Sequence, residues 1–385
     1  MTRHFTTDEY AGRRRRTCAA LAAAGLDGLL MFRQESMYYL TGYDTFGYVF
    51  FQCMVLTADD RCFLLTRAPD LRQARHTSTL PDDAIHIWVD RADAAPAVQL
   101  RDLLAREGLA GTRLGVEYEA YGLTARNGRR LDAALEGFCR LEDASDLVSD
   151  QRRVKSPAEI AYVRQAAELA DRALDAALAL AHPGAFEGDI LAAMQGAVFA
   201  GGGDYPGNEF IIGSGPDALL CRYFSGRRHL DAEDQITLEW AGAYRHYHAA
   251  MMRTIPIGRI TDRHRTMHAA ATDAMAACEA MVAPGRTMGD VFGEYARVCD
   301  AAGLAAHRLN ACGYSLGTTF APNWMDTPMF YAANPAPIEP GMVLFLHMIL
   351  MDSDANVAMC PGHTVVVTPA GCERLSRHDL SLTMG

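Results

Sequence analysis

The first part of the chain, residues 1–152, alternates between helical and extended patterns of hydrophobic positions. Apolar residues recur at helical spacing over 7–24 and over 97–109, where Gly108 ends the predicted helix. Short apolar runs predict strands in GLDGLLMF, AIHIWVD and RLGVEYE, and a hairpin formed by YVFFQCMVLTA and RCFLLTR. This alternation predicts an N-terminal α/β domain.

A long helix opens the second part of the chain, residues 153–385. Ser156, Pro157 and Glu159 are typical of a helix start, and the helical spacing of apolar residues continues to 182–184, where His-Pro-Gly ends it. Further helices are predicted at 187–200, 263–282 and 288–303, between the strands EFIIGSG, QITLEWAG, MVLFLHMIL and HTVVVT. Because neighbouring strands can pair locally while the helices cluster, we expect an α+β domain with a curved antiparallel sheet.

Composition and charge narrow the classes of partner. The 385 residues include 47 acidic and 36 basic side chains, and the net charge of −11 disfavours nucleic acid and anionic membranes. The ten cysteines form no CxxC pair, which argues against a zinc ribbon or a disulfide framework. The apolar stretch after the RRRR at 13–16 is short and interrupted by Asp27, which favours a helix over a signal sequence. With no run of about eighteen apolar residues, we expect a soluble cytoplasmic protein.

The segment TLEWAGAYRHYHAAMMRT, residues 237–254, predicts two strands and a turn. Strand alternation directs Glu239, His248, Ala250 and Met252 to one side. A carboxylate on an apolar strand loses hydration, which raises its pKa and suits a general base or acid. The alternative is a buried carboxylate neutralised by Arg253 or another cation. For His248, the alternative is a strand histidine in a structural polar network.

Six segments occur in the order that is typical of one superfamily: VKSPAEIAYVRQAAELAD, GSGPDALLCRY, EWAGAYRHYHAAMMRT, CGYSLG, IEPGMVLFLH and GHTVVVTPAG. On these motifs the chain is identified as a member of the creatinase/prolidase/aminopeptidase P family, and the resemblance covers nearly the whole chain. HFTTDEYAGR, YLTGYDTFGYVFFQC, GGGDYP and GYSLGTTFAPNW resemble the ectoine hydrolase and creatinase branch. The resemblance implies a pita-bread catalytic domain and a homodimer, in which residues 32–48 of one subunit close the pocket of the other.

The resemblance also locates five positions that hold metal ligands in the metallopeptidase members. These positions carry Glu239, Ala250, Tyr314, His347 and Gly362. Alanine and glycine cannot ligate, a neutral tyrosine is a poor ligand, and one carboxylate cannot offset the repulsion between two divalent cations. We therefore expect no dinuclear centre and no cofactor. A single metal on Glu239, His248 and His347 is the alternative, because a carboxylate with two histidines is a zinc-like set.

The surviving polar residues supply roles for catalysis without metal. His347, on an apolar strand, is a candidate proton shuttle, and the hydroxyl of Tyr314 is a candidate oxyanion donor. Arg222 stands where relatives place a histidine that contacts substrate, and a guanidinium can clamp a carboxylate. Tyr223, Cys360 and His363 are further candidates for substrate binding. Each of these residues also has a structural alternative. His347 would be a structural histidine, Tyr314 a packing residue, Arg222 a surface residue and Cys360 an inert buried thiol.

Together with these residues, the resemblance to the ectoine hydrolase and creatinase branch implies a metal-independent hydrolase that cleaves an amide or amidine C–N bond in a small zwitterionic metabolite. Glu239, with His248 or His347, would activate water, Tyr314 would stabilise the oxyanion, and Arg222 would hold a substrate carboxylate. Three alternatives remain at this point: a metal-dependent Xaa-Pro dipeptidase, a C–N or C–S lyase on the same scaffold, and a pseudoenzyme that binds a ligand without turnover.

Overall fold

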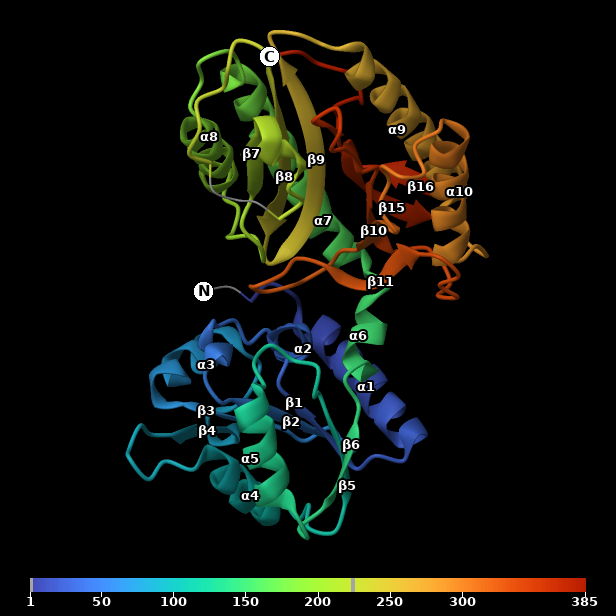
Figure 1. Ribbon diagram of the computed structural model, residues 1–385. Helices are drawn as coiled ribbons and strands as arrows, with labels where there is room; N and C mark the ends of the chain where they lie inside the picture. Colours follow the sequence, from blue (N-terminus) through green and yellow to red (C-terminus); the bar gives the residue numbers. More distant parts are fainter. Residues whose placement is uncertain (1–2, 223–225) are drawn as a thin grey trace. The chain divides into compact units, whose positions relative to one another are not determined.

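The computed structural model of the protein describes residues 3–222 and 226–385 (Figure 1). The chain divides into two compact units, Met1–Arg152 and Arg153–Gly385, which are described separately. Tyr223, one of the predicted binding residues, lies outside the described residues. No described helix combines the length and the apolar character that crossing a membrane requires.

The first unit is built on a six-stranded mixed sheet in the order β4-β3-β2-β1-β5-β6. The side chains of β1 alternate between two cores, so that Leu29 faces one side of the sheet and Leu30 the other. Helices therefore cover both faces, as the predicted α/β domain requires. The elements are α1 Thr7–Ala24, β1 Gly28–Met31, α2 Gln34–Thr41, β2 Cys53–Thr57, β3 Cys62–Arg67, α3 Leu71–Thr77, β4 Ile85–Trp88, α4 Pro96–Arg106, β5 Arg113–Val116, α5 Ala125–Leu135, β6 Arg140–Asp143 and α6 Leu147–Arg152.

The second unit holds a larger antiparallel sheet in the order β11-β10-β12-β15-β9-β8-β7, with β16 paired to β15. Its strands are β7 Ile211–Ser214, β8 Asp234–Tyr244, β9 Tyr247–Ile257, β10 Ala311–Ser315, β11 Asp326–Tyr331, β12 Val343–His347, β15 Gly362–Thr368 and β16 Gly371–Arg374, beside a small pair, β13 Leu350–Asp352 and β14 Val357–Met359. Its helices are α7 Pro157–Leu180, α8 Glu187–Ala200, α9 Asp262–Met281 and α10 Met288–Ala301. Helices and an antiparallel sheet thus form the α+β domain that the sequence predicts.

Helix α7 packs directly against the long hairpin of β8 and β9. Its start is the predicted capping box, in which Ser156 and Glu159 bond each other's backbone. A Cβ atom at Gly242 of β8 would lie 1.9 Å from the carbonyl oxygen of Ala166, so only glycine permits this approach of strand and helix. The indole of Trp240 adds a hydrogen bond of 2.9 Å to the carbonyl of Ala170. One face of β8 is therefore sealed by α7, and the other face is left for the site.

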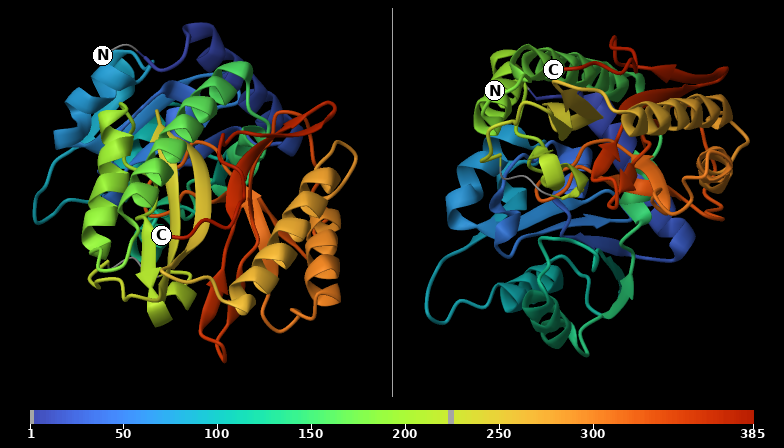
Figure 2. Two further views of the ribbon diagram at one scale, coloured as in Figure 1. Left: turned by 90° about the horizontal axis from the view of Figure 1, so that it is seen from above. Right: turned by 45° about the horizontal axis from the view of Figure 1, so that its top comes forward.

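Helices α9 and α10 lie side by side against the other half of the sheet (Figures 1 and 2). Their apolar faces and one face of β10, β12 and β15 form a single core, which contains Met275, Phe292, Tyr295 and Leu346. The opposite face of these three strands carries the polar residues described below. The helices are thus confined to one side, and the remaining side of the sheet is free for chemistry.

Two local predictions differ from the structure. The sequence predicts TLEWAG and YRHYHAAMMRT as the two hairpin strands, the second starting at Tyr244, whereas the turn is formed by Arg245 and His246, with φ of 50° and 64°. Such a turn usually contains glycine or asparagine, and neither residue is present here to mark it. His246 stacks on Phe320 with ring centroids 4.2 Å apart, which helps to hold the strained turn.

The run MVLFLHMIL was predicted as one strand, but β12 ends at His347 and β13 begins at Leu350. The backbone N–H of Met348 instead donates to the carbonyl of Pro361, 2.9 Å away. Because all these residues are apolar, their hydrophobicity alone cannot mark the break.

Candidate active site

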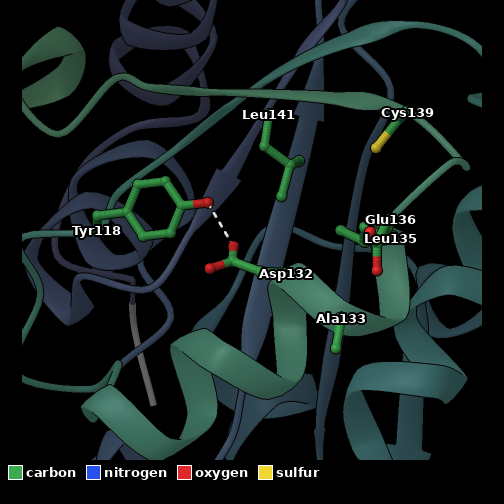
Figure 3. A pocket seen from close by; sticks show the side chains of 7 residues that line it. All are labelled: Tyr118, Asp132, Ala133, Leu135, Glu136, Cys139 and Leu141. Atoms are coloured by element: carbon green, nitrogen blue, oxygen red, sulfur yellow. Dashed lines mark hydrogen bonds between the residues drawn. The ribbon is translucent and has the colours of Figure 1, made fainter.

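An open pocket of about 500 Å³ in the first unit holds none of the predicted site residues. Its polar feature is a hydrogen bond of 2.6 Å from the hydroxyl of Tyr118 to Asp132 (Figure 3). The remaining lining residues are Ala133, Leu135, Glu136, Cys139 and Leu141. The predicted chemistry therefore lies elsewhere, on the sheet of the second unit.

Four of the positions singled out by the sequence form one row across this sheet. Glu239 of β8 is opposite Met252 of β9, and Met252 is opposite Gly362 of β15. Gly362 is in turn opposite His347 of β12. Because directly opposed residues point to the same face of an antiparallel sheet, the side chains in this row share one face.

A hydrogen bond shows how strongly the sheet curves around this face. The hydroxyl of Tyr314, on β10, donates to Oε1 of Glu239 over 3.2 Å. The two strands are four places apart in the sheet, and a flat sheet would separate them by about 19 Å. The curvature therefore folds β10 over toward β8 and brings residues 75 positions apart in sequence into one site.

Burial controls the protonation of Glu239, which is 9% exposed. Loss of hydration raises the pKa of its carboxyl to about 7, although the hydrogen bond from Tyr314 and the charge of Arg222 act in the lowering direction. Burial and the nearby carboxyl raise the pKa of Tyr314 well above its usual value, so this residue remains a neutral donor. Glu239 consequently exchanges a proton near neutral pH, as a general base or acid must.

His347 provides a second titratable group on the same face of the sheet. Its ring lies edge-on to Tyr314, with centroids 5.7 Å apart, and tilts against Phe345. Burial, with a smaller contribution from the charge of Arg222, lowers the pKa of this histidine to about 4, so the imidazole is neutral. Its Nδ1 atom is buried and has no hydrogen-bond partner among the described residues. A buried nitrogen without a partner is available to a bound molecule.

Arg222 is exposed, and its charge acts on Glu239, Tyr314 and His347 alike. The guanidinium therefore lies near all three, which is compatible with the predicted carboxylate clamp. The binding role itself stays a prediction.

Cys360 lies near Glu239 but is not poised as a nucleophile. Burial raises the pKa of its thiol to about 12, with further contributions from Cys221 and Glu239 in the same direction. Its backbone N–H donates to the hydroxyl of Thr254 over 3.1 Å. Cys312 belongs to the core under α9 and α10. Cys360 can therefore contribute to the site only as an uncharged packing residue.

The structure separates His248 from Glu239, contrary to the prediction that the two act on one water. His248 is paired with Ala243, four residues along the hairpin from Glu239, or roughly 13 Å. Its Nε2 accepts the backbone N–H of Gly207 over 2.8 Å, so Nδ1 carries the hydrogen and faces Thr319 at 3.1 Å. Both nitrogens are engaged and burial lowers the pKa to about 4. His248 therefore anchors the GGGDYPGN loop, residues 201–208, and the structural alternative applies.

His363 must also be removed from the predicted substrate-binding residues. It neighbours Gly362 on β15, and strand alternation turns it to the other face. There its Nε2 lies 2.5 Å from Oε1 of Glu279 on α9, and the histidine is fully buried. Arg253, expected to hold a carboxylate of the hairpin, instead donates to the carbonyls of Met252 and Gly362 at 2.8 and 2.6 Å. It ties β9 to β15 from behind the site.

Two contributors to the site were not predicted from the sequence. Trp324, 1% exposed, donates its indole N–H to the hydroxyl of Tyr314 over 2.8 Å. Phe345 packs against both Tyr314 and His347. Trp324 lies in GYSLGTTFAPNW, which carried the family resemblance, but nothing in its spacing indicated this contact. The i, i+2 relation of Phe345 to His347 did place both on one face.

The donor set does not fit the metal pair that the resemblance implies. Ala250 and Gly362 offer no ligand, and even a Cβ atom at Gly362 would lie 3.0 Å from the ring of Phe345. A side chain at position 362 would therefore press against an aromatic ring. Within residues 3–222 and 226–385, no three His, Cys, Asp or Glu side chains are grouped as metal ligands. The alternative single-metal set does not form either, because His248 lies four residues along the hairpin from Glu239 and both of its ring nitrogens are engaged.

Comparison with known proteins identifies the family of the chain. The model of metallopeptidase family M24 matches residues 161–369, and the model of the creatinase/prolidase N-terminal domain matches residues 13–154. Because the first match covers more than half of the chain, the chain belongs to metallopeptidase family M24. Membership places it among hydrolases with the pita-bread fold, and the predicted family and fold class are confirmed.

Individual relatives refine the comparison. An uncharacterized hydrolase/peptidase, y4tM, of Sinorhizobium fredii is 29% identical, with 97% of this chain and 96% of the relative covered. Ectoine hydrolase of Halomonas elongata is 26% identical, with the same coverage of both chains. The crystal structure of dipeptidase PepE from Mycobacterium ulcerans superposes with a TM-score of 0.84 at 25% identity, covering 99% of each chain.

Proposed function

We propose that this protein is a metal-independent hydrolase that cleaves an amide or amidine C–N bond in a small zwitterionic metabolite. The observation that carries the proposal is the set of five positions that hold metal ligands in the metallopeptidase members. Ala250 and Gly362 carry no donor, while Glu239 and His347 are buried, with pKa values of about 7 and about 4. The similarity to ectoine hydrolase along the full chain supports this branch of the family.

In the proposed reaction, the carboxylate of Glu239 takes a proton from a water molecule, and the resulting hydroxide attacks the amide or amidine carbon. Once protonated, Glu239 is a weaker acceptor for Tyr314, whose hydroxyl is then free to donate to the developing negative charge. The carboxylic acid returns its proton to the leaving nitrogen, so one water is consumed and no group stays on the enzyme. Nδ1 of His347 orients the water or the leaving group, and Arg222 binds the substrate carboxylate.

The proposal is tested by incubating the protein with ectoine, creatine and a set of Xaa-Pro dipeptides. Mass spectrometry identifies products that contain one added water. We expect turnover of a cyclic or linear amidine or amide to persist after treatment with a chelator and to fall at least about 100-fold in Glu239→Gln. Products that lack the added water would instead identify a lyase. Unchanged masses across all substrates would favour a binding protein without turnover.

A second candidate is a metal-dependent dipeptidase, which the likeness to PepE favours. It predicts a different outcome in the same assay, because chelation would abolish turnover of Xaa-Pro dipeptides and added manganese would restore it. The donor set described above argues against this outcome.

The resemblance to the family also leads us to propose a homodimer in which residues 32–48 reach the partner's site. Phe46 and Val49 in and beside this segment are 74% and 54% exposed within one chain. Light scattering on the purified protein tests this proposal, and a monomer at micromolar concentration would contradict it.

A further inference from the structure

Trp324 sits behind the acid–base site in the loop between β10 and β11. Its side chain is 1% exposed, and the indole nitrogen lies 2.8 Å from the hydroxyl oxygen of Tyr314. An indole N–H can donate a hydrogen bond but cannot accept one. In this contact, therefore, the oxygen of Tyr314 is the acceptor.

This contact fixes the direction of the next hydrogen bond. Tyr314 has a single hydroxyl hydrogen, and Oε1 of Glu239 lies 3.2 Å from its oxygen. With one lone pair engaged by Trp324, the hydrogen is directed to the carboxyl, and a donor that also accepts is polarised into a stronger donor. The chain of donors thus runs in one direction from Trp324 through Tyr314 to Glu239.

We infer that Trp324 is a positioning residue, which acts through Tyr314 to hold Glu239 as the ionised base. This inference rests on the proposed function, in which Glu239 takes the proton from water. Trp324 touches neither the carboxyl nor the reacting atoms, so its effect is on the proton affinity of Glu239. Among the residues that the structure describes, the other titratable or charged groups that act on this carboxyl or lie near it are Arg222, Cys221, Cys360 and His347.

The test follows the protonation of Glu239 directly in the full-length protein. Glutamate labelled with ¹³C at the side-chain carboxyl is incorporated, and the NMR signal that disappears in Glu239→Gln is titrated from pH 4 to 10. In Trp324→Phe we expect the midpoint to move upward by about half a pH unit, because Tyr314 becomes a weaker donor to the carboxylate. The acid limb of kcat/KM, where a substrate is turned over, should move by the same amount.

Trp240→Phe is the matched control. Trp240 is also fully buried and donates its indole N–H over 2.9 Å, but to the carbonyl of Ala170 on the other side of β8. It should lose similar stability while the midpoint of Glu239 stays in place. Equal midpoints in wild type and Trp324→Phe, or equal shifts in both tryptophan variants, would overturn the inference.

If Trp324→Phe does not fold, benzothienylalanine at position 324 keeps the shape of the side chain and removes only the N–H. The same upward shift is expected, and an unchanged midpoint would overturn the inference. The titration requires no turnover, so its result can be obtained whether or not the protein hydrolyses a substrate. Absence of any hydrolysis would refute that function while leaving the midpoint shift measurable.

Discussion

Glu239 combines two properties that pull in opposite directions. Its strand lies in an apolar environment, which disfavours a charge, yet Tyr314 donates to the carboxyl and Arg222 lies near it. The outcome is a carboxyl with a pKa of about 7, compared with 4.5 for an exposed glutamate. This gap between folded and unfolded states links the site to both stability and rate.

We expect Glu239→Gln to be more stable than the wild type at pH 8. The folded pKa is raised, so the stability that depends on a protonated carboxyl is complete below about pH 4.5 and is lost as the pH rises through about 7. Glutamine has the same shape without the ionisation, so the gain at pH 8 is on the order of 2–3 kcal/mol and the gain at pH 5 much smaller. Urea unfolding at both pH values measures this difference.

Glu233→Gln serves as the control, because Glu233 is exposed and pairs only with Arg259 at 3.2 Å among the described residues. It should leave stability within about 0.5 kcal/mol at both pH values. Burial raises the pKa of Glu117, in the first unit, to about 7 as well, so some pH dependence will persist in every variant. Equal destabilisation of Glu239→Gln at pH 5 and pH 8 would contradict the assignment of a raised pKa.

The same carboxyl predicts the pH dependence of turnover. As the base, Glu239 must be ionised, so kcat/KM should rise with pH through a single step centred near 7. His347, whose pKa is about 4, stays neutral over this range and adds no second step. Initial rates between pH 5 and pH 9 on a substrate that is hydrolysed provide the measurement. A flat profile, or a step centred near pH 4, would argue against Glu239.

At the scale of elements, the periodicity of hydrophobic residues predicts the helices and strands whose apolar faces are buried. The helices 7–24 and 187–200 were expected where α1 and α8 occur, and the curved antiparallel sheet follows from the pattern of short strands. The same alternation placed Glu239 and His248 on one face, which the pairing shows. Alternation could not show that Glu239 and His248 lie four residues apart along the hairpin. Their separation depends on the strand register, which is set by a turn at Arg245 and His246 that contains no glycine.

The strand pattern predicts a curved sheet, but it does not predict how far the sheet curves or which buried side chains become partners. Tyr314 meets Glu239 only because the sheet folds over, and neither residue carries a local signal for this. The sequence analysis assigns His363 to the face of β15 that carries the site, whereas it lies on the opposite face. Side chains alternate along a strand, but a largely apolar run does not show which of the two faces carries the site. The acidic partner, Glu279, is 84 residues away on α9.

His248 and the 201–208 loop supply a prediction at this scale. In His248→Phe, the N–H of Gly207 loses its acceptor, so we expect stability to fall by about 1–3 kcal/mol and amide exchange in 201–208 to accelerate. Hydrogen–deuterium exchange with mass spectrometry resolves this loop. The titration of Glu239 should not change, because the two side chains are separated along the hairpin.

His264→Phe is a suitable comparison, since His264 is also buried but caps α9 through Thr261. Its loss should accelerate exchange at the start of α9 and leave 201–208 protected. If His248→Phe leaves the loop as protected as in the wild type, the anchoring role is wrong.

At the scale of the whole molecule, every candidate catalytic group described here belongs to the unit Arg153–Gly385. This unit keeps the fold of a metallopeptidase family while its ligand positions carry other residues. Fold similarity at a TM-score of 0.84 and a changed donor set are therefore compatible, because the fold is maintained by cores that the site residues do not enter.

Manganese should leave the melting temperature of the intact protein unchanged to within about 1 °C. A ligand present at 100 times its Kd would add about 2.7 kcal/mol and raise the melting temperature by several degrees. Differential scanning calorimetry with 1 mM Mn²⁺, and again with a chelator, makes the comparison. A relative that retains all five ligands is the positive control, and a shift of several degrees in this protein would show that a metal site exists.

The close approach of Gly362 and the ring of Phe345 has a consequence for protein engineering. A glutamate at 362 would bring its Cβ to 3.0 Å from the ring, so the ring would have to move, and shrinking Phe345 alone would leave a void. The two positions therefore have to be changed together: a variant designed to carry a carboxylate at 362 needs a smaller residue at 345 as well.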